Sequence, residues 1–424
     1  MELKKYNANH TQVLKINQIV RTISETHKFD KDKLIAINTS DVENGVMGNG
    51  TLTFVDELKG QFKKTIVKDD ILFSEIRPAN RRFAKVTTKN TKDYVVSTKL
   101  MVLRKYNEDV DLEYFYYCLT NQPFLDILQR RAENRIGSFP QITFDLLSEY
   151  AFPIPPISEQ KRISSVISTL DKKIALNRQI NQNLEAMAKQ LYDYWFVQFD
   201  FPNEEGKPYK SSGGEMVWNE KLKRNIPVGW HCGNLFEIAV FTNGLACQKF
   251  RPKDDEVPLP VIKIREMHDG ISVDTEEVTS NIPESVKVYN GDVLFSWSAS
   301  LEVMLWAYGL GGLNQHIFKV TSANDFPKSF YYFQLLDYVD VFKKMAEARK
   351  TTMGHITQDH LQQSTIAIPD NKDIADKFEE LISPIFRQII KLQEEISNLT
   401  KRRDELLPLL MNGQVSVNSD LSDD

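Results

Sequence analysis

Apolar residues recur at alternating steps of four and three positions between Phe378 and Leu410. This spacing lines them up along one side of an α-helix, so it predicts a long helix whose apolar seam packs against another helix. Arg403 is the one polar residue in the series. The apolar seam positions are Phe378, Ile382, Ile385, Ile389, Leu392, Ile396, Leu399, Leu406 and Leu410.

A second stretch with the same spacing runs from Ile163 to Trp195, and each of its positions lies 215 residues before a counterpart in the later stretch. Two register-matched helices are therefore predicted. Asn177 and Asn181 place amides in the middle of the earlier seam, where no polar partner from the later helix is evident. We expect them to be partly exposed or to contact another subunit. The apolar positions are Ile163, Ile167, Leu170, Ile174, Leu184, Ala188, Leu191 and Trp195.

The repetition extends to the segments that precede the helices. Short strings recur in the same order in both halves, and each half ends in Ile-Pro before it continues into its long helix. Such self-similarity indicates an internal duplication. The repeated strings are Asp70–Ser74 with Asp292–Ser296, Phe115–Tyr117 with Phe330–Tyr332, and Ile142–Thr143 with Ile356–Thr357.

The β-branched runs are short and are separated by Asn-Gly pairs and charged turns, which favours strands joined by tight turns. In the first half they are followed by an expected helix, Glu113–Gln129. We therefore expect an α+β fold with two mixed domains. The expected strands are Leu34–Ile37, Ile66–Val67, Ile71–Phe73 and Tyr94–Leu103, then Leu259–Ile264, Val286–Tyr289, Val293–Trp297 and His316–Val320.

The length of 424 residues predicts two or three domains, and a hydrophobic fraction of 41% is enough to form their cores. The three cysteines are far apart, which argues against a disulfide framework and favours a reducing cytoplasm. The first residues are polar and no run of about 18 apolar residues occurs, so neither secretion nor membrane insertion is predicted. The net charge of -5 restricts nucleic-acid binding to local patches.

The main basic patch lies between Arg77 and Lys105, where nine Lys or Arg residues occur with a single acid, Asp93. A solvated surface is the ordinary explanation of such a run. Its guanidinium and amide groups also suit bidentate contacts to guanine and adenine in a major groove, and the repeat architecture gives this interpretation equal weight. The DNA-binding candidates here are Arg77, Asn80, Arg81, Arg82 and Lys99.

Two loops at corresponding positions supply further candidates. In the first half, Arg135, Ser138 and Gln141 suit phosphate contacts, with ordinary capping of a helix C-terminus as the alternative. Basic residues are sparser in the second half, and acids follow the first of its patches. The candidates there are Lys249, Arg251, Lys263 and Arg265, and in the loop Arg349, Lys350, Thr352 and His355.

Catalytic and metal-binding patterns are absent from the sequence. There is no nucleotide-phosphate loop, no metalloprotease or hydrolase motif, and no string typical of nucleases or amino-methyltransferases. His316 and His355 lack paired carboxylates or cysteines, so no metal site is predicted. The aromatic cluster between Tyr192 and Phe201 is expected to pack internally on the neighbouring domain, with docking of a partner subunit as the alternative.

Three strings resemble the specificity (S) subunits of type I restriction-modification enzymes. Pro153–Ile163 resembles the sequence that opens their central helix, Ile226–Trp230 the entry to their second domain, and Leu406–Gly413 the end of their second helix. The resemblance covers almost the whole chain, and the order and spacing of the strings make it specific. The resemblance implies two target-recognition domains that bind double-stranded DNA, and two long helices that pair as an antiparallel coiled coil.

On this resemblance, each domain reads one half of a bipartite, asymmetric DNA site and the helices act as the spacer. The implied partners are two adenine-N6 methyltransferase (M) subunits and restriction/translocase (R) subunits. These partners would carry S-adenosylmethionine, ATP and Mg, while this chain binds no cofactor and catalyses no reaction. A bacterial or archaeal cytoplasm is expected. The alternative is a coiled-coil adaptor with protein-binding domains and no DNA readout.

The domain boundaries follow from the Ile-Pro strings and the ends of the seams. The target bases, the spacer length, and whether the complex restricts or only methylates stay open. We expect a first target-recognition domain in residues 1–155, a central helix in 156–200, a linker in 201–225, a second target-recognition domain in 226–372, a C-terminal helix in 373–413 and a flexible acidic tail in 414–424.

Overall fold

The computed structural model describes residues 11–58, 60–134, 140–253, 255–298, 300–348, 356–411 and 414. The chain divides into two compact units, one built from residues 1–172 and 400–424 and the other from residues 173–399. Each unit therefore combines a sheet-rich domain with parts of both long helices. Across the described ranges, no helix is long and apolar enough to cross a membrane.

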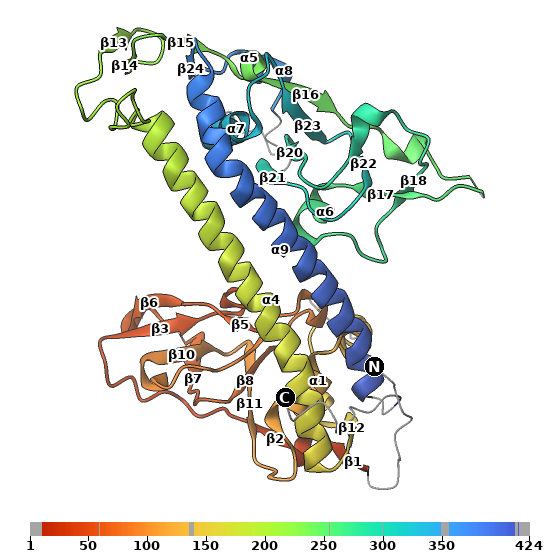
Figure 1. Cartoon of the computed structure of the whole chain (residues 1–424). Helices are drawn as coiled ribbons and strands as arrows, with labels where there is room; N and C mark the ends of the chain where they lie inside the picture. The colour runs from red at the N-terminus through yellow and green to blue at the C-terminus, as the bar shows by residue number, and fades with distance from the viewer. Residues whose placement is uncertain are drawn as a thin grey trace. The chain divides into compact units, whose positions relative to one another are not determined.

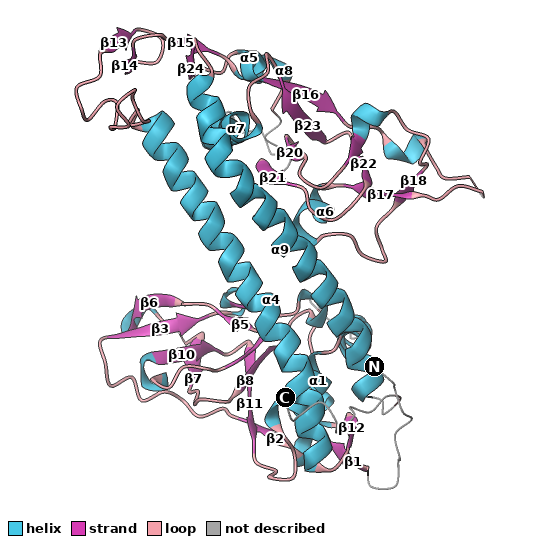
Figure 2. Cartoon of the chain, in the orientation of Figure 1, coloured by secondary structure: helices cyan, strands magenta, loops and turns pink. Residues whose placement is uncertain are grey.

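The first domain contains two four-stranded sheets (Figure 2). One has the strand order β2 (Val20–Thr22), β11 (Leu100–Lys105), β8 (Ile71–Ser74), β9 (Phe83–Lys85), and the other the order β6 (Thr51–Phe54), β3 (Lys33–Ile37), β10 (Tyr94–Ser97), β7 (Phe62–Lys64). Two further pairs are β1 (Gln12–Lys15) with β12 (Ala151–Ile154), and β4 (Val42–Glu43) with β5 (Val46–Met47). The central pair β3–β10 is parallel, and the other pairs are antiparallel.

Three short helices complete the first domain: α1 (Leu112–Thr120), α2 (Gln122–Glu133) and α3 (Phe144–Ser148). The prediction of one continuous helix over Glu113–Gln129 is wrong, because the backbone of Asn121 is extended between α1 and α2. Its side-chain oxygen accepts a hydrogen bond from the Phe124 amide (2.9 Å) and caps α2.

The predicted strand at Ile66–Val67 is also wrong, because these two residues lie in a loop that leads into a turn at Lys68 and Asp69. The Val67 amide donates to a carboxylate oxygen of Asp70 (2.8 Å) rather than to a neighbouring strand. Asp69, inside the turn, has a left-handed backbone with φ of 72°. A short polar loop therefore occupies the place where β-branched residues favoured a strand.

The second domain repeats the strand order of the first, which confirms the predicted duplication (Figure 1). Its central parallel pair is β17–β22. One sheet has the strand order β16 (Ala239–Asn243), β23 (Ile317–Ser322), β20 (Val293–Ser296), β21 (Glu302–Leu305). The other has the order β18 (Glu277–Val278), β17 (Leu259–Ile262), β22 (Gly311–Leu313), β19 (Lys287–Val288). A separate pair is formed by β15 (Trp230–Gly233) and β24 (Ile366–Pro369). Its helices are α5 (Leu235–Ile238), α6 (Ile264–Asp269), α7 (Lys328–Ala348) and α8 (Gln358–Gln362).

The two long helices are α4 (Ile157–Tyr192), which continues as a π-helical turn to Val197, and α9 (Asp373–Met411). The start of α4 is fixed by the buried side chain of Gln160. Its Oε1 accepts a hydrogen bond from the Asp111 amide (2.7 Å), and its Nε2 donates to the Asp109 and Pro155 carbonyls (2.9 and 2.8 Å). The helix start is thereby tied to the loop that precedes α1.

Within each unit the two long helices contact each other, and in the second unit their contacts show that they run in opposite directions. In the first unit Asp171 of α4 pairs with Arg403 of α9 (3.1 Å). In the second unit Asn177 Nδ2 donates to Glu395 Oε2 (3.0 Å). In the same unit Asn181, four residues later on α4, contacts Ile389, six residues earlier on α9, as in an antiparallel pair.

The two seam asparagines differ from expectation. Asn177 and Asn181 are only 5% and 7% exposed, so the prediction of partial exposure or contact with another subunit is wrong. The polar partner of Asn177 is Glu395, which lies beside the apolar seam of α9 rather than in it. Asn181 Nδ2 reaches the Ile389 carbonyl at 3.4 Å, while its buried Oδ1 has no partner among the described residues.

Both helices contribute side chains to both cores. The first core includes Ile163 and Ile167 of α4 and Leu407, Leu410 and Met411 of α9. The second core includes Ala188, Tyr192 and Trp195 from the far end of α4, and Phe378 and Ile382 from the start of α9. Neither domain therefore builds its core from its own segment alone.

The aromatic cluster that closes α4 is internal, as predicted. Phe196 packs against Phe330 and Phe378, with both ring centroids at 5.0 Å. Phe201 stacks on Trp230 at 5.7 Å. The segment expected to be a linker carries a hairpin, formed by β13 (Met216–Asn219) and β14 (Arg224–Pro227).

Candidate nucleic-acid interface

The basic turn, residues Arg77 to Arg82, connects β8 to β9 in the first domain. Its centre, Pro78–Asn80, is a single turn of 3-10 helix, and the flanking Arg77 and Arg81 both have left-handed backbones, with φ of 47° and 53°. Residues other than glycine adopt this conformation at a cost in energy, so surrounding contacts must hold it. The fold therefore imposes the shape of this turn.

Side chains from two neighbouring elements hold the basic turn. Gln129 of α2 accepts a hydrogen bond from the Ala79 amide (3.1 Å). Arg81 donates from Nη1 to Oε1 of Gln122, also in α2 (2.5 Å), and from Nε to Oδ1 of Asn44, in the turn between β4 and β5 (2.7 Å). The turn is thus fixed from two sides.

Two of the candidate DNA-binding residues in this stretch contact other residues of the first domain. Arg81 lies over the ring of Phe83 (5.7 Å), and burial lowers the pKa of its guanidinium. Arg82 donates to the Ser40 carbonyl (3.2 Å) and pairs with Glu43 (3.3 Å). These contacts make both side chains part of the support of the turn.

The other three candidates of this stretch, Arg77, Asn80 and Lys99, are exposed. Lys99 lies beside the end of β8, because its carbonyl accepts a hydrogen bond from the Glu75 amide (3.0 Å). These three residues therefore lie at the surface of the domain around one strand end.

The fold brings a distant loop beside the basic turn. The Arg77 amide donates to the Pro140 carbonyl (3.1 Å), and Gln141 Nε2 donates to Glu75 Oε2 (2.8 Å). Gln141 is thus next to the turn, as a shared interface requires, but its amide is engaged by Glu75. The sequence did not indicate this proximity.

A buried ion pair supports β8 and was missed by the sequence reasoning. Both carboxylate oxygens of Asp70 accept from the guanidinium of Arg104 on β11 (2.7 and 2.8 Å), and these hydrogen bonds raise the pKa of Arg104. In the second domain Asp292 pairs with Lys319 of β23 (2.9 Å). The recurrence of an acid before both repeated strands was the signal that could have identified these pairs.

The candidates in the second domain are partly neutralised. Lys263 pairs with Glu276 (2.6 Å), and Arg265 pairs with Glu266 (2.7 Å). Each carboxylate offsets a positive charge that would otherwise attract phosphate. Lys249 and Arg251 are exposed.

The loop before α8 is attached to its domain by the same kind of backbone hydrogen bond as the loop before α3. Its Ile356 amide donates to the Trp297 carbonyl (3.0 Å), as the Ile142 amide donates to the Glu75 carbonyl (2.7 Å). The C-terminal ends of the two loops are therefore held at corresponding places in the two domains. Six candidates lie outside the described residues: Arg135, Ser138, Arg349, Lys350, Thr352 and His355.

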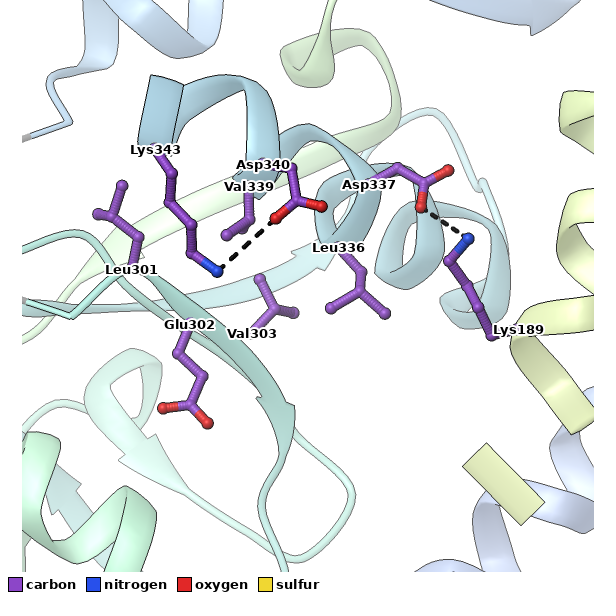
Figure 3. Close-up of a pocket in the computed structure, with 9 residues that line it drawn as sticks. All are labelled: Lys189, Leu301, Glu302, Val303, Leu336, Asp337, Val339, Asp340 and Lys343. Carbon is purple, nitrogen blue, oxygen red and sulfur yellow. Dashed lines mark ion pairs between the residues drawn. The ribbon is translucent and has the colours of Figure 1, made fainter. Parts of the chain in front are cut away.

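The second unit also contains an open hollow of about 360 Å³ between α4, α7 and β21 (Figure 3). Ion pairs border it, Lys189 with Asp337 (2.9 Å) and Lys343 with Asp340 (3.7 Å). Burial raises the pKa of the Asp337 carboxyl. The rest of the wall is formed by Glu302 and by four apolar side chains: Leu301, Val303, Leu336 and Val339. In the part of the chain that is described, no group of three His, Cys, Asp or Glu side chains is placed to hold a metal ion.

Comparisons with known proteins agree with the duplicated fold. Residues 10–186 and 227–400 each match the type I restriction modification DNA specificity domain. The type I restriction enzyme HindI specificity subunit of Haemophilus influenzae is 28% identical and aligns over 94% of this chain and 98% of that protein. The MjaIX specificity subunit of Methanocaldococcus jannaschii is 26% identical over 72% of this chain and 69% of that protein. A crystal structure of the type-I restriction-modification S subunit from M. genitalium shares the fold, with a TM-score of 0.55 at 15% identity over 97% of this chain and 99% of that one.

Proposed function

Because the chain belongs to the type I restriction-modification DNA specificity family, we propose that it is the sequence-reading subunit of a type I restriction-modification complex. Each target-recognition domain binds one half of a bipartite, asymmetric site on double-stranded DNA. The single observation that carries this proposal is the duplication: one DNA specificity domain occurs twice, with one strand order, in a single chain.

The asymmetry of the site follows from the difference between the two copies. In the first domain the segment after the strand end at Ser74 contains the basic turn, with Arg77 and Asn80 exposed. In the second domain the segment after Ser296 contains Ser300, Leu301 and Glu302 instead. Side chains so different in charge cannot present the same donors and acceptors to base edges.

Within the first domain we assign different roles to the basic residues. Arg77 and Asn80 read bases, because guanidinium and amide groups bind guanine and adenine bidentately. Lys99 and the loop through Gln141 contact phosphates. Arg81 and Arg82 position the turn through their contacts with Asn44, Gln122 and Glu43. In the second domain Lys249 and Arg251 are the stronger candidates, because Lys263 and Arg265 are already paired.

We further propose that the long helices form an antiparallel coiled coil that acts as the spacer between the half-sites. The contacts of Asn177 with Glu395 and of Asp171 with Arg403 support this pairing. The partners are two adenine-N6 methyltransferase (M) subunits and restriction/translocase (R) subunits. These partners hold S-adenosylmethionine, ATP and Mg and carry out the chemistry, so this chain is not an enzyme by itself. The complex acts in a bacterial or archaeal cytoplasm.

The test replaces both base-reading candidates. In a host that expresses the complete complex, Arg77→Ala with Asn80→Ala should relax the bases of one half-site and leave the other half unchanged. Each bidentate contact contributes about 1–3 kcal/mol of discrimination, so base preference at the affected positions should fall by about tenfold or more. Genome-wide mapping of N6-methyladenine measures both halves in one experiment.

The matched control is Lys89→Ala, which removes one exposed positive charge from the same domain at a distance in sequence from the turn. It should weaken binding slightly at all sites and leave the motif intact. Equal relaxation of both half-sites by the Arg77→Ala, Asn80→Ala variant would contradict the assignment of one domain to one half.

The alternative, a coiled-coil adaptor without DNA readout, is not favoured by membership in a DNA specificity family. The two functions differ in their response to salt. Binding of the assembled complex to duplex DNA should weaken steeply as salt rises, because phosphate contacts release counterions. An adaptor would show no such binding.

A further inference from the structure

A polar contact joins both long helices to α1 of the first domain. Arg403 Nη1 of α9 donates to Asp171 Oδ1 of α4 (3.1 Å), and the hydroxyl of Tyr117 in α1 donates to Asp171 Oδ2 (2.8 Å). The side chains of Asp171 and Arg403 are 35% and 22% exposed. We call these three residues the Asp171 tie. It joins three elements, α1, α4 and α9, through one carboxylate.

The duplication makes the second domain a built-in comparison. The residues 215 positions after Tyr117 and Asp171 are Tyr332 and Phe386, and the residue 215 positions before Arg403 is Ala188. Tyr332 and Phe386 meet edge to face at 5.2 Å, and Ala188 is fully buried. The three polar positions of the first unit are therefore filled by an aromatic contact and a methyl group in the second.

The second domain has an ion pair to α4 of its own, but it is built differently. Lys189 pairs with Asp337 of α7 at the border of the open hollow. This pair joins two elements, whereas the Asp171 tie also includes α9. The first domain is therefore held at one point to both long helices.

A series of ring contacts connects the Asp171 tie to the basic turn. Tyr117 meets Tyr116 edge to face at 5.9 Å, and Tyr116 meets Phe83 in the same way at 6.1 Å. Phe83 directly follows the turn, and Arg81 lies over its ring at 5.7 Å. Because side chains in a packed core transmit small shifts, the position of α1 on the helices affects the position of the turn.

We propose that Tyr117, Asp171 and Arg403 are positioning residues for the first half-site. The Asp171 tie fixes α1 on both long helices, and α1 fixes the basic turn through Tyr116 and Phe83. A charge-assisted hydrogen bond has a defined direction, so it sets an orientation more strictly than an apolar contact does. This inference rests on the proposed function for its reference to a half-site, while its structural part stands independently.

The structural part is tested on the purified full-length chain by hydrogen–deuterium exchange. Tyr117→Phe removes only the hydroxyl that donates to Asp171, and Asp171→Asn removes the charge while it keeps the shape. In both variants amide protection in α1 and the basic turn should fall by about tenfold, as for the loss of one hydrogen bond to a charged group. Tyr332→Phe is the matched control, because its hydroxyl makes no hydrogen bond within the described part of the chain, and protection should not change.

The functional part is tested by methylation mapping with the same variants in the complete complex. Tyr117→Phe and Asp171→Asn should lower occupancy and base preference at the first half-site by about threefold to tenfold, while Tyr332→Phe leaves both halves unchanged. Exchanging the charges, Asp171→Arg with Arg403→Asp, should restore the first half-site, since the Tyr117 hydroxyl then accepts instead of donating.

The outcomes separate the two proposals. Unchanged protection of α1 and the turn in Asp171→Asn would overturn the Asp171 tie, whatever the chain binds. A fall in protection with equal effects on both half-sites would overturn the positioning role. A wild-type complex that methylates no bipartite site would overturn the proposed function and leave the exchange result standing.

Discussion

Replacing Asn181 with leucine should stabilise the second unit. Asn181 is 7% exposed in the seam of α4, and its Nδ2 makes one long contact, 3.4 Å, to the Ile389 carbonyl. Its Oδ1 is buried without a partner among the described residues. Leucine has the same branched arrangement of four side-chain heavy atoms, although its methyl groups need more room, and it continues the apolar seam towards Leu184.

The magnitude follows from three contributions. Removing a buried polar atom without a partner stabilises by about 1–3 kcal/mol. Burying leucine adds roughly 1.5–3 kcal/mol at full burial. Loss of the long contact to Ile389 and an imperfect fit together cost about 1–3 kcal/mol. We expect a net gain of about 1–3 kcal/mol, which corresponds to a rise in Tm of roughly 3–9 °C for a unit of this size.

The assay is thermal unfolding of the purified chain, followed by circular dichroism and calorimetry. Asn183→Leu is the control, because Asn183 is exposed on the same helix and surface substitutions usually change stability by about 0.5 kcal/mol or less. A Tm of Asn181→Leu at or below that of the wild type would refute the reasoning. It would mean that both polar atoms of the buried Asn181 amide have hydrogen-bond partners in the folded chain.

The same variant connects stability to function. A buried asparagine in a helix seam fixes register at a cost in stability. If Asn181 has this role, the more stable variant should hold its register less strictly. Methylation maps of the variant complex should then contain sites with spacers other than that of the wild type.

Two predictions remain, on pH dependence and on the spacer. Burial lowers the pKa of His231, but hydrogen bonds to Asp370 and Glu237 outweigh it, so the net shift is upward. The stabilisation by His231 is therefore complete below the unfolded pKa of about 6.5 and is lost as pH rises through the folded pKa. The Tm difference between the wild type and His231→Gln should be larger at pH 6 than at pH 8. An equal difference at the two pH values would contradict the upward pKa shift. One heptad inserted after Ile174 and one after Ile396 should lengthen the DNA spacer that the complex reads by about 10 Å, or about three base pairs, and should lower the occupancy of the DNA sites. An unchanged spacer at full occupancy would show that the helices do not set the spacer length.

The large-scale organisation could be predicted because its signals repeat. The seam period gives two long helices, and the structure has them at α4 and α9. The repeated strings Asp70–Ser74 and Asp292–Ser296 contain β8 and β20, which occupy the same place in their sheets. Periodicity and repetition are averages over many residues, so single departures do not obscure them.

Local chemistry could not be predicted where one side chain decides the result. The Asn121 cap splits a helix, and the Asp70 carboxylate turns Val67 away from a strand. Glu395 was overlooked as the partner of Asn177 because it lies outside the seam. Arg81 resembles a DNA-binding residue in sequence, yet its contacts lie within the domain, and no linear pattern distinguishes these two uses.

The last turns of α9 are synthesised long after the domain whose core they complete. Leu407, Leu410 and Met411 belong to the core of the first domain, where the sulfur of Met411 lies 3.4 Å from that of Cys118. A ribosome adds these residues about 250 positions after it has finished the segment they complete, a delay of roughly 10–50 s at typical rates. During that interval the first domain exposes the apolar surface that the end of α9 covers in the finished chain. An interrupted translation product therefore carries an unfinished first domain, which chaperones and proteases can recognise.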